Sequence, residues 1–313
     1  MKFFESCKRT GAALGLGAVL ATASNVASAL PVPWQLNMTR GVTKTSQEVY
    51  QIHMWALYVC IAIGIVVFGA MIVAMVKFRK SKGAVAAKWS HNTKVEMVWT
   101  VVPIVILVVL AAPATNVMIS MAHTQDSQMT VKITGYQWKW RYEYINWGDK
   151  PYHVNFVSKL DGASDRTRQL KSGLDPNAVV VGNDKTYLLD VDHPLVLPTD
   201  TKVRFVVTGD DVIHAWWVPD LGWKQDAIPG IINDDWTKIH EPGVYRGQCA
   251  ELCGQDHGFM PIVVKAVPKD EFVKWLDTQE AALAPPPAAA ATAAVPAAAP
   301  ASAEAAPPAA PKG

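Results

Sequence analysis

Two long apolar stretches near the N-terminus of this 313-residue chain determine its predicted architecture. Residues 52–76 and 97–119 contain no Asp, Glu, Lys or Arg, and each is near or above the roughly 20 residues that a bilayer-spanning helix needs. Pro103 and Pro113 in the second stretch are tolerated more readily in membrane helices than in soluble ones. We therefore predict a transmembrane helical hairpin over residues 50–121; two buried helices of a soluble core are the alternative.

The charges around the two stretches predict how the hairpin is oriented. Between them a short loop near residues 77–95 carries only basic charges, which marks the cytoplasmic side: Lys77, Arg79, Lys80, Lys82, Lys88 and Lys94. Residues 1–29 combine basic residues, a short apolar run and a final Ala-Ser-Ala, as in a secretory signal peptide, with a retained anchor as the alternative. Residues 30–49 then form an exported segment. The chain after about residue 120 is expected in the periplasm or an equivalent outer compartment.

From Met129 onward the pattern changes to short β-rich segments separated by turn residues. This is typical of a Greek-key sandwich or barrel, and we predict an all-β domain over residues 122–280. The predicted strands lie at residues 129–145, 186–192, 194–209, 212–219, 236–249 and 260–268. Residues 157–184 are rich in Gly, Asp and Ser and predict a long loop, while 270–280 have the apolar spacing of a closing helix. Residues 281–313 are almost only Ala and Pro, which predicts a disordered tail.

The charge balance limits the partners of the exported domain. The whole chain has a formal net charge of +2, but residues 128–282 hold 22 acidic and 17 basic residues, a net of −5. A nucleic-acid partner is therefore not expected. A basic protein partner outside the membrane is favoured, because its positive charge would be attracted to the acidic domain as the two proteins approach.

One short loop, "CAELCGQDHGFM" at residues 249–260, collects the side chains that bind soft metal ions. Cys249, Cys253, His257 and Met260 offer thiolate, imidazole and thioether groups, and "VIHAWWVP" adds His214 from upstream. This combination favours copper, and two thiolates can bridge a pair of copper ions. A disulfide in an oxidising compartment and a structural zinc site of both cysteines and two histidines are the alternatives.

Two segments carry a resemblance to a known family. "VIHAWWVPDLGWKQDAIPG" and "GVYRGQCAELCGQDHGFMPIVV", behind two membrane helices, resemble subunit II of haem–copper cytochrome c oxidases of the bacterial type, over about residues 45–280. The resemblance implies a cupredoxin-like domain with a binuclear copper A centre. Its implied ligands are His214, Cys249, Cys253, His257, Met260 and the backbone carbonyl of Glu251. It also implies that the Glu251 carboxylate reaches a magnesium ion shared with subunit I.

The resemblance further implies where electrons arrive. In "YQWKWRYEY" the two-residue period of a strand places Tyr136, Trp138, Trp140, Tyr142 and Tyr144 on one face, most of them in the core. The family accepts electrons through the tryptophan equivalent to Trp138. Tyr136 and Lys139 depart from the family pattern, as does Ile231, which stands where an arginine is often found.

Acidic residues near His214 are candidates for docking a donor protein. We expect Asp210 and Asp211 to lie at the rim of the metal site and to attract a basic cytochrome c. An ordinary turn is the alternative explanation, because Gly-Asp is also turn chemistry.

Glu96 opens the second membrane helix on the cytoplasmic side. Residues 93–96, Thr-Lys-Val-Glu, fit a capping box, which alone explains a glutamate there. The resemblance implies a second role for Glu96, at the mouth of a proton path into subunit I.

Together these features predict the electron-accepting subunit of a respiratory oxidase in the bacterial inner membrane. The expected partners are subunit I with its haem and copper B, subunit III, cytochrome c and the surrounding lipid. We expect no haem in this chain, since it contains no C-x-x-C-H motif. Rival classes are a membrane-tethered copper chaperone, a quinol-oxidase subunit, which lacks the copper ligands, and a nitrous-oxide reductase, which lacks the hairpin.

Overall fold

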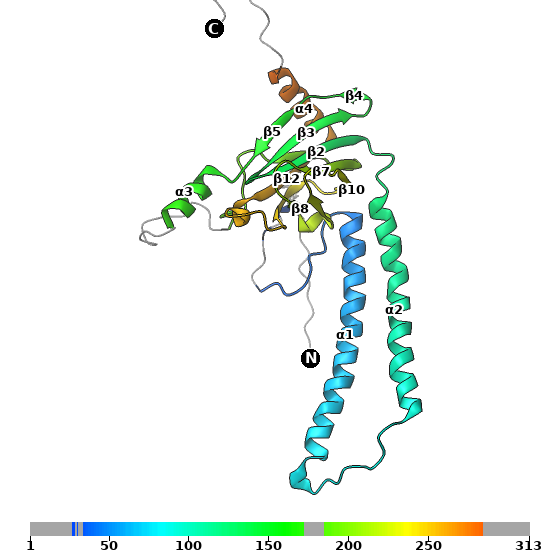
Figure 1. The fold of residues 1–313 in the computed structure, drawn as a ribbon. Coiled ribbons are helices and arrows are strands. Elements are labelled where there is room, and N and C mark those ends of the chain that lie inside the picture. Colours follow the sequence, from blue (N-terminus) through cyan, green and yellow to red (C-terminus); the bar gives the residue numbers. More distant parts are fainter. Residues whose placement is uncertain (1–26, 29, 31–33, 172–184, 284–313) are drawn as a thin grey trace, which may run out of the picture.

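The structure is a computed structural model that describes residues 27, 28, 30, 34–171 and 185–283. Figure 1 shows a helical hairpin, α1 and α2, that extends away from a β domain. Helix α1 spans Lys44–Lys77 and α2 spans Thr93–Ala122, with a short 3-10 turn, η1, at Lys80–Lys82 between them. Most of the predicted signal peptide, and the predicted tail beyond residue 283, lie outside the described residues.

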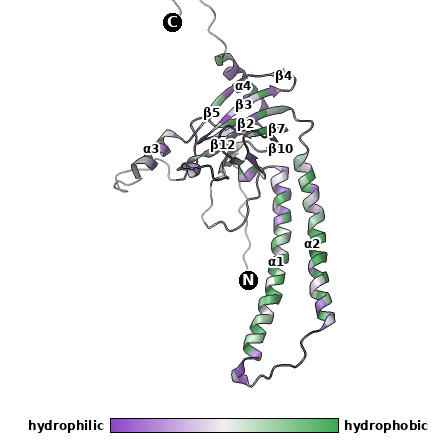
Figure 2. Ribbon diagram, viewed as in Figure 1, coloured by the Kyte–Doolittle hydropathy of each residue, from purple (hydrophilic) through white to green (hydrophobic). Residues whose placement is uncertain are grey.

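The central turns of both helices are built from apolar residues, and Figure 2 draws them mostly in green, with purple turns toward the ends. Both are long and apolar enough to span a membrane, and neither is buried within the chain. For example, Phe68 and Leu107 are 64% and 66% exposed. A helix that is hydrophobic all round needs an apolar environment. The helical hairpin is therefore as predicted, with helices that continue several residues beyond the apolar stretches.

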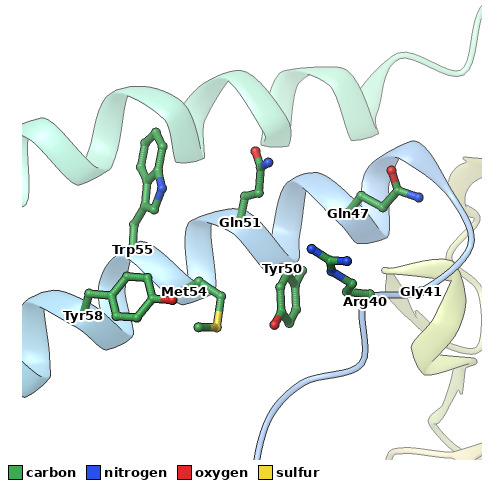
Figure 3. A pocket seen from close by; sticks show the side chains of 8 residues that line it. All are labelled: Arg40, Gly41, Gln47, Tyr50, Gln51, Met54, Trp55 and Tyr58. Carbon is green, nitrogen blue, oxygen red and sulfur yellow. The ribbon is translucent and has the colours of Figure 1, made fainter. Parts of the chain in front are cut away.

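A cavity of about 590 Å³ lies against the end of α1 nearest the β domain (Figure 3). It is lined by aromatic, amide and cationic groups: Arg40, Gly41, Gln47, Tyr50, Gln51, Met54, Trp55 and Tyr58. Aromatic side chains with polar neighbours are typical of the level where a membrane helix leaves the hydrocarbon core. This end of α1 therefore has the chemistry of a bilayer surface.

Side chains cap the first turn of each membrane helix. Thr43 and Ser46 form a reciprocal capping box at the start of α1. At the start of α2, Asn92 is the N-cap, and its side chain accepts from the amides of Lys94 and Val95. The capping box predicted over residues 93–96 is therefore wrong by one position. Glu96 still participates, because its carboxylate accepts from the Asn92 amide at 3.1 Å.

The hairpin is attached to the β domain at the outer ends of both helices. The Thr43 hydroxyl donates to the carbonyl of Leu221 at 2.8 Å. The Trp236 indole donates to the carbonyl of Ser120, near the end of α2, at 2.9 Å. These contacts join residues more than 100 positions apart, so they fix both helices to the same domain.

The β domain consists of two sheets that pack face to face. The first sheet has the order β6-β12-β11-β8-β9, with β1 also paired to β11. Its strands are β6 Leu195–Pro198, β12 Pro261–Val267, β11 Gly243–Cys249, β8 His214–Trp217, β9 Lys224–Ala227 and β1 Ala27–Ser28. The second sheet has the order β10-β7-β2-β3-β4, with β5 also paired to β3. Its strands are β10 Asn233–Thr237, β7 Val203–Gly209, β2 Met129–Tyr136, β3 Lys139–Trp147, β4 Lys150–Pro151 and β5 Asn155–Ser158.

Aromatic side chains fill the space between the sheets. The Trp216 ring stacks on Phe205 and Trp223, with centroid distances of 5.7 and 4.9 Å. Its indole donates to the Tyr142 hydroxyl at 3.3 Å. Such pairs contribute about 0.5–1.5 kcal/mol each beyond the area they bury. Because Trp216 lies two residues after His214, this packing also holds β8 in register.

The structure corrects three details of the predicted β domain. Residues 129–145 are a hairpin with its turn at Gln137–Trp138, so Trp138 does not share the buried face of β3. The predicted loop over 157–184 contains a helix, α3, at Gly162–Lys171. The predicted strand at 186–192 is absent among the described residues, where only Val191 makes an isolated bridge. The closing helix is confirmed as α4, Lys269–Leu283, which runs three residues into the segment predicted as tail.

A buried carboxyl group makes the stability of the β domain depend on pH. Asp235 is 6% exposed, and burial raises its pKa from the usual 3.8 to about 7. Between these two values the folded state binds a proton that the unfolded state releases, so stability falls as the pH rises from about 4 to 7. Since each pKa unit corresponds to about 1.4 kcal/mol, the loss is at most about 4 kcal/mol.

We expect Asp235→Asn to raise the thermal midpoint of the full chain in detergent at pH 8, by several degrees, and to change it little at pH 4. Asparagine has nearly the same shape and no charge to bury, and it keeps the acceptor for the Trp236 amide. Asp149→Asn, at an exposed turn, is the control. A difference between wild type and Asp235→Asn that does not grow from pH 4 to pH 8 would contradict this assignment.

Candidate metal centre

The candidate metal loop, residues 249–260, connects two neighbouring antiparallel strands. Cys249 is the last residue of β11, and Met260 comes directly before β12. The Cys249 amide donates to the Met260 carbonyl at 3.0 Å, which closes the loop at its base. Between them, Cys253 lies in irregular backbone, and the 3-10 helix η3, His257–Phe259, brings His257 to within 3.5 Å of the Cys253 sulfur. Thus the local fold gathers four candidate donors within one loop.

His214 comes from β8, the strand next to β11. The pairing of Cys249 with Trp216 brings the first residue of β8 to the same edge of the sheet. The His214 side chain is fully buried. A Cβ atom on Gly135 would lie 3.0–3.1 Å from atoms of His214, so glycine leaves the space that this imidazole occupies.

The donor atoms converge without a covalent bond between them. The sulfur atoms of Cys249 and Cys253 are 3.9 Å apart, whereas a disulfide requires about 2.05 Å. His214 Nδ1 lies 4.0 Å from the Cys249 sulfur, and His257 Nδ1 lies 3.5 Å from the Cys253 sulfur. The Cys249 thiol points at the Glu251 carbonyl at 3.4 Å. The cysteines are therefore free thiols here, and the disulfide alternative does not describe this structure.

The two thiols have opposite tendencies to lose a proton. Burial raises the pKa of Cys249, but its interactions with His214 and with the backbone of Ala215 and Glu251 lower the pKa to about 7. Burial and the neighbouring Cys249 raise the pKa of Cys253 to about 12. The pair therefore resists carrying two negative charges by itself. A bound cation would supply the charge that both thiolates need.

The carboxylate of Asp211 fixes the orientation of the His214 ring. Its Oδ1 lies 2.9 Å from His214 Nε2, and its Oδ2 accepts from the Gln137 amide at 2.8 Å. A carboxylate only accepts, so Nε2 carries the proton and Nδ1 is left to face the thiols. Burial by itself would raise the pKa of Asp211. The hydrogen bonds from His214 and from the Gln137 backbone amide outweigh this effect and lower the pKa. A carboxylate behind a histidine is the usual support for a metal ligand.

The turn between β2 and β3 lies against the metal loop. The Trp138 indole and the side-chain amide of Gln137 (Nε2) both donate to the Cys253 carbonyl, at 3.2 and 3.1 Å. Gly254, with a φ of +116°, lies directly beneath, and a Cβ there would come within 3.1–3.2 Å of both side chains. Trp138 is thus joined by one hydrogen bond to a candidate ligand residue.

The other predicted site residues lie around the loop or far from it. Glu251 is exposed next to the thiols, while the Asp210 side chain is 64% exposed and 3.9 Å from Arg141. Ile231 is 50% exposed. Lys139 and Arg141 both lie over the Tyr136 ring. Glu96 is at the opposite end of the hairpin from the loop.

Sequence reasoning missed two residues that support the site. It gave no role to Gln137, although its position beside Trp138 was an available clue. It assigned Asp211 to docking only, because its contact with His214 depends on how the turn before β8 folds.

Comparisons with known proteins connect both parts of the chain to one family. Residues 129–267 match the family described as cytochrome C oxidase subunit II, periplasmic domain, and residues 31–117 match its transmembrane domain. A probable cytochrome c oxidase subunit 2 of Rickettsia bellii is 37% identical over 246 residues, which is 79% of this chain and 84% of the relative. Cytochrome c oxidase subunit 2 of Cereibacter sphaeroides is 32% identical over 283 residues, 87% of this chain and 92% of the relative.

A solved structure also resembles the chain. The crystal structure of the periplasmic domain of subunit II of cytochrome oxidase of Bradyrhizobium japonicum has 37% sequence identity and a TM-score of 0.41. The match covers 51% of this chain and 99% of that one.

We expect Asp211→Asn to weaken copper binding by the full chain about 10–100-fold, which is typical when the group behind a ligating histidine is changed. The substitution removes the charge that holds His214 Nε2–H. The dissociation constant, measured by competition with a chelator, checks this. Asp210→Asn is the matched control, because that side chain is exposed and does not touch His214. Equal affinities for the two variants would contradict the role of Asp211.

Proposed function

Since the chain belongs to the cytochrome c oxidase subunit II family, we propose that it accepts electrons from cytochrome c at a binuclear copper A centre. It then passes them to haem in subunit I, where oxygen is reduced. The observation that carries this proposal is the meeting of the two free thiols of the metal loop with the imidazole rings of His257 and of His214 on β8, beside Trp138.

The donor set fits a pair of copper ions better than one zinc ion. Structural zinc takes four ligands, whereas this loop together with His214 offers two thiol sulfurs, two ring nitrogens, a thioether and a carbonyl. The proposed ligands are His214, Cys249, Cys253, His257, Met260 and the carbonyl of Glu251. When bound, the copper ions supply a one-electron redox couple. The protein supplies fixed donors, because Asp211 orients His214 and the 99%-buried Met260 cannot rotate into water.

Trp138 is the proposed point where electrons arrive. It is partly exposed at the tip of the β2–β3 hairpin, and its indole donates to the Cys253 carbonyl. Its ring thus extends from the surface to the backbone of a copper ligand.

Asp210 is the proposed docking charge. It is exposed near the same surface, in a domain whose net charge is −5, so it would attract a basic cytochrome c. Asp211 is at most a secondary docking group, because both of its oxygens already have internal partners.

Contacts with the partner subunits are further proposals. The exposed Glu251 carboxylate is available to a magnesium ion, which would need its remaining ligands from subunit I and water. Subunit III completes the proposed complex. We place the complex in the bacterial inner membrane, with the basic connection after α1 in the cytoplasm and the β domain in the periplasm. Cleavage after Ala29, which would remove the two-residue strand β1, and the division of the chain at about residue 122 belong to the same proposal.

Glu96 is the proposed point where protons enter a path into subunit I. It lies in the first turn of α2, at the end of the hairpin with the basic connection. Its carboxylate accepts one backbone hydrogen bond, which leaves its second oxygen without a partner in the described residues.

The full chain in detergent should bind two copper ions, with one unpaired electron shared over both nuclei in the electron paramagnetic resonance spectrum. Cys249→Ser should lose this signature, because one bridging thiolate is removed.

In the assembled oxidase, Trp138→Phe should slow electron uptake from cytochrome c about tenfold or more, a barrier increase of about 1.4 kcal/mol or more, with copper content unchanged.

Trp147→Phe is the control for Trp138→Phe, since Trp147 lies at the far end of β3. In the same assay, Asp210→Asn should slow uptake at low salt and not at high salt. A full chain that binds no copper, or only one ion per chain, would refute the proposed function.

Glu96→Gln in the assembled oxidase should lower turnover several-fold. Glutamine keeps an acceptor for the Asn92 amide, so the helix start is preserved while the ionisable group is lost. Glu48→Gln, at the outer end of α1, is the control and should retain wild-type turnover. Wild-type oxygen consumption and proton release by Glu96→Gln would exclude this role.

A further inference from the structure

A single arginine of α3 contacts the metal loop on both sides of its 3-10 turn. Arg168 Nη1 and Nη2 lie 3.4 and 3.5 Å from the two carboxylate oxygens of Asp256. Its guanidinium also lies 4.5 Å from the centre of the Phe259 ring. Asp256 directly precedes His257, and Phe259 directly precedes Met260. Arg168 therefore contacts the residues that directly precede two candidate ligands, His257 and Met260.

The guanidinium is held in place from its own helix as well. Arg168 Nε donates to Asp165 Oδ1 at 2.8 Å, one turn earlier in α3. The Arg168 and Asp256 side chains are only 22% and 24% exposed, so water screens the pair less than it screens a surface pair. Stacking on an aromatic ring and paired contacts to a carboxylate use the flat shape of arginine, which lysine lacks.

The helix that carries Arg168 is itself fixed to the β domain. The Asp161 carboxylate accepts from the amides of Ala163 and Ser164 at the start of α3. The Asp161 amide donates to the Asp190 carbonyl at 3.0 Å. Asp190 in turn forms an ion pair of 2.8 Å with Arg246 on β11. A continuous series of contacts thus leads from β11 through α3 back to the loop that follows β11.

We propose that Arg168 is a positioning residue that clamps η3 and thereby keeps His257 and Met260 in place for copper, which slows copper release and shields the thiols. This inference rests on the proposed copper site, but the clamp acts on the loop whether or not copper is bound. Figure 1 shows α3 on the side of the domain away from the hairpin, where it leaves the membrane helices untouched.

The test uses the full chain in detergent with Arg168→Gln, Asp256→Asn and the double variant. Copper loss is followed with an excess of a copper(I) chelator under reducing conditions, at low and high salt. In a second measurement on the metal-free chain at fixed pH, N-ethylmaleimide labels the thiols. Mass spectrometry then follows the peptide that holds Cys249 and Cys253, with Cys60 on α1 as the internal reference. Arg166→Gln is the matched control, because Arg166 is an exposed residue of the same helix.

We expect each single variant to accelerate copper loss and labelling of the two thiols about tenfold, and the double variant to do no more than either single one, as for two groups that act as a unit. High salt should accelerate copper loss from wild type and not from Arg168→Gln. Arg166→Gln should behave as wild type. Arg168→Lys keeps the charge but not the flat guanidinium. Its rates of copper loss and thiol labelling should lie between those of wild type and Arg168→Gln.

Three results would overturn the clamp: unchanged rates in Arg168→Gln, effects of the two substitutions that add, or equal acceleration by Arg166→Gln. If wild type takes up no copper, the proposed function fails, and the labelling rates alone then decide whether the clamp exists. If wild type binds two copper ions and Arg168→Gln loses them at the wild-type rate, only the clamp fails.

Discussion

Two thiol sulfurs and one imidazole nitrogen lie within 4.8 Å of one another in a buried space, and the rest of the domain has to make that proximity possible. Polar groups crowded together away from water are unfavourable unless each has a partner. Here the Asp211 carboxylate accepts from His214, and the Glu251 carbonyl lies against the Cys249 thiol. The Cys253 carbonyl accepts from Trp138 in the β2–β3 turn. The antiparallel pairing of β8 with β11 brings His214 to the loop, and the Trp216 ring anchors β8 against Phe205 of the other sheet.

The features that sequence alone could predict are those that depend on local composition. The membrane helices follow from uninterrupted apolar stretches, and the metal loop follows from four soft donors within twelve residues. The closing helix α4 follows from the spacing of Phe272, Trp275 and Leu276. In each of these segments the local residue pattern is compatible with few other structures. The predicted and observed structures therefore agree there.

The features that sequence alone could not predict depend on contacts between distant segments. The alternation of polar and aromatic residues continues through Gln137 and Trp138, so nothing local marks the turn that puts Trp138 over the loop. Helix α3 has a polar composition that resembles a loop, and it is held by Ser164, which accepts from the Leu188 amide, and by Arg168, which contacts Asp256. The cap of α2 is a smaller error, of one position. Asn92 and Thr93 can both accept hydrogen bonds from the amides of a first turn, so the sequence does not distinguish them.

The attachment of both membrane helices to the β domain has a geometric consequence. In the proposed function the domain passes electrons to an acceptor within the bilayer, and because electron tunnelling weakens steeply with separation, the metal loop would need a constant height above that acceptor. Thr43, just before α1, bonds to Leu221 in the 3-10 turn between β8 and β9, and Trp236 of β10 bonds to Ser120 near the end of α2. The domain is therefore attached to the hairpin at two separate points, and together these contacts define the height of the metal loop above the membrane helices.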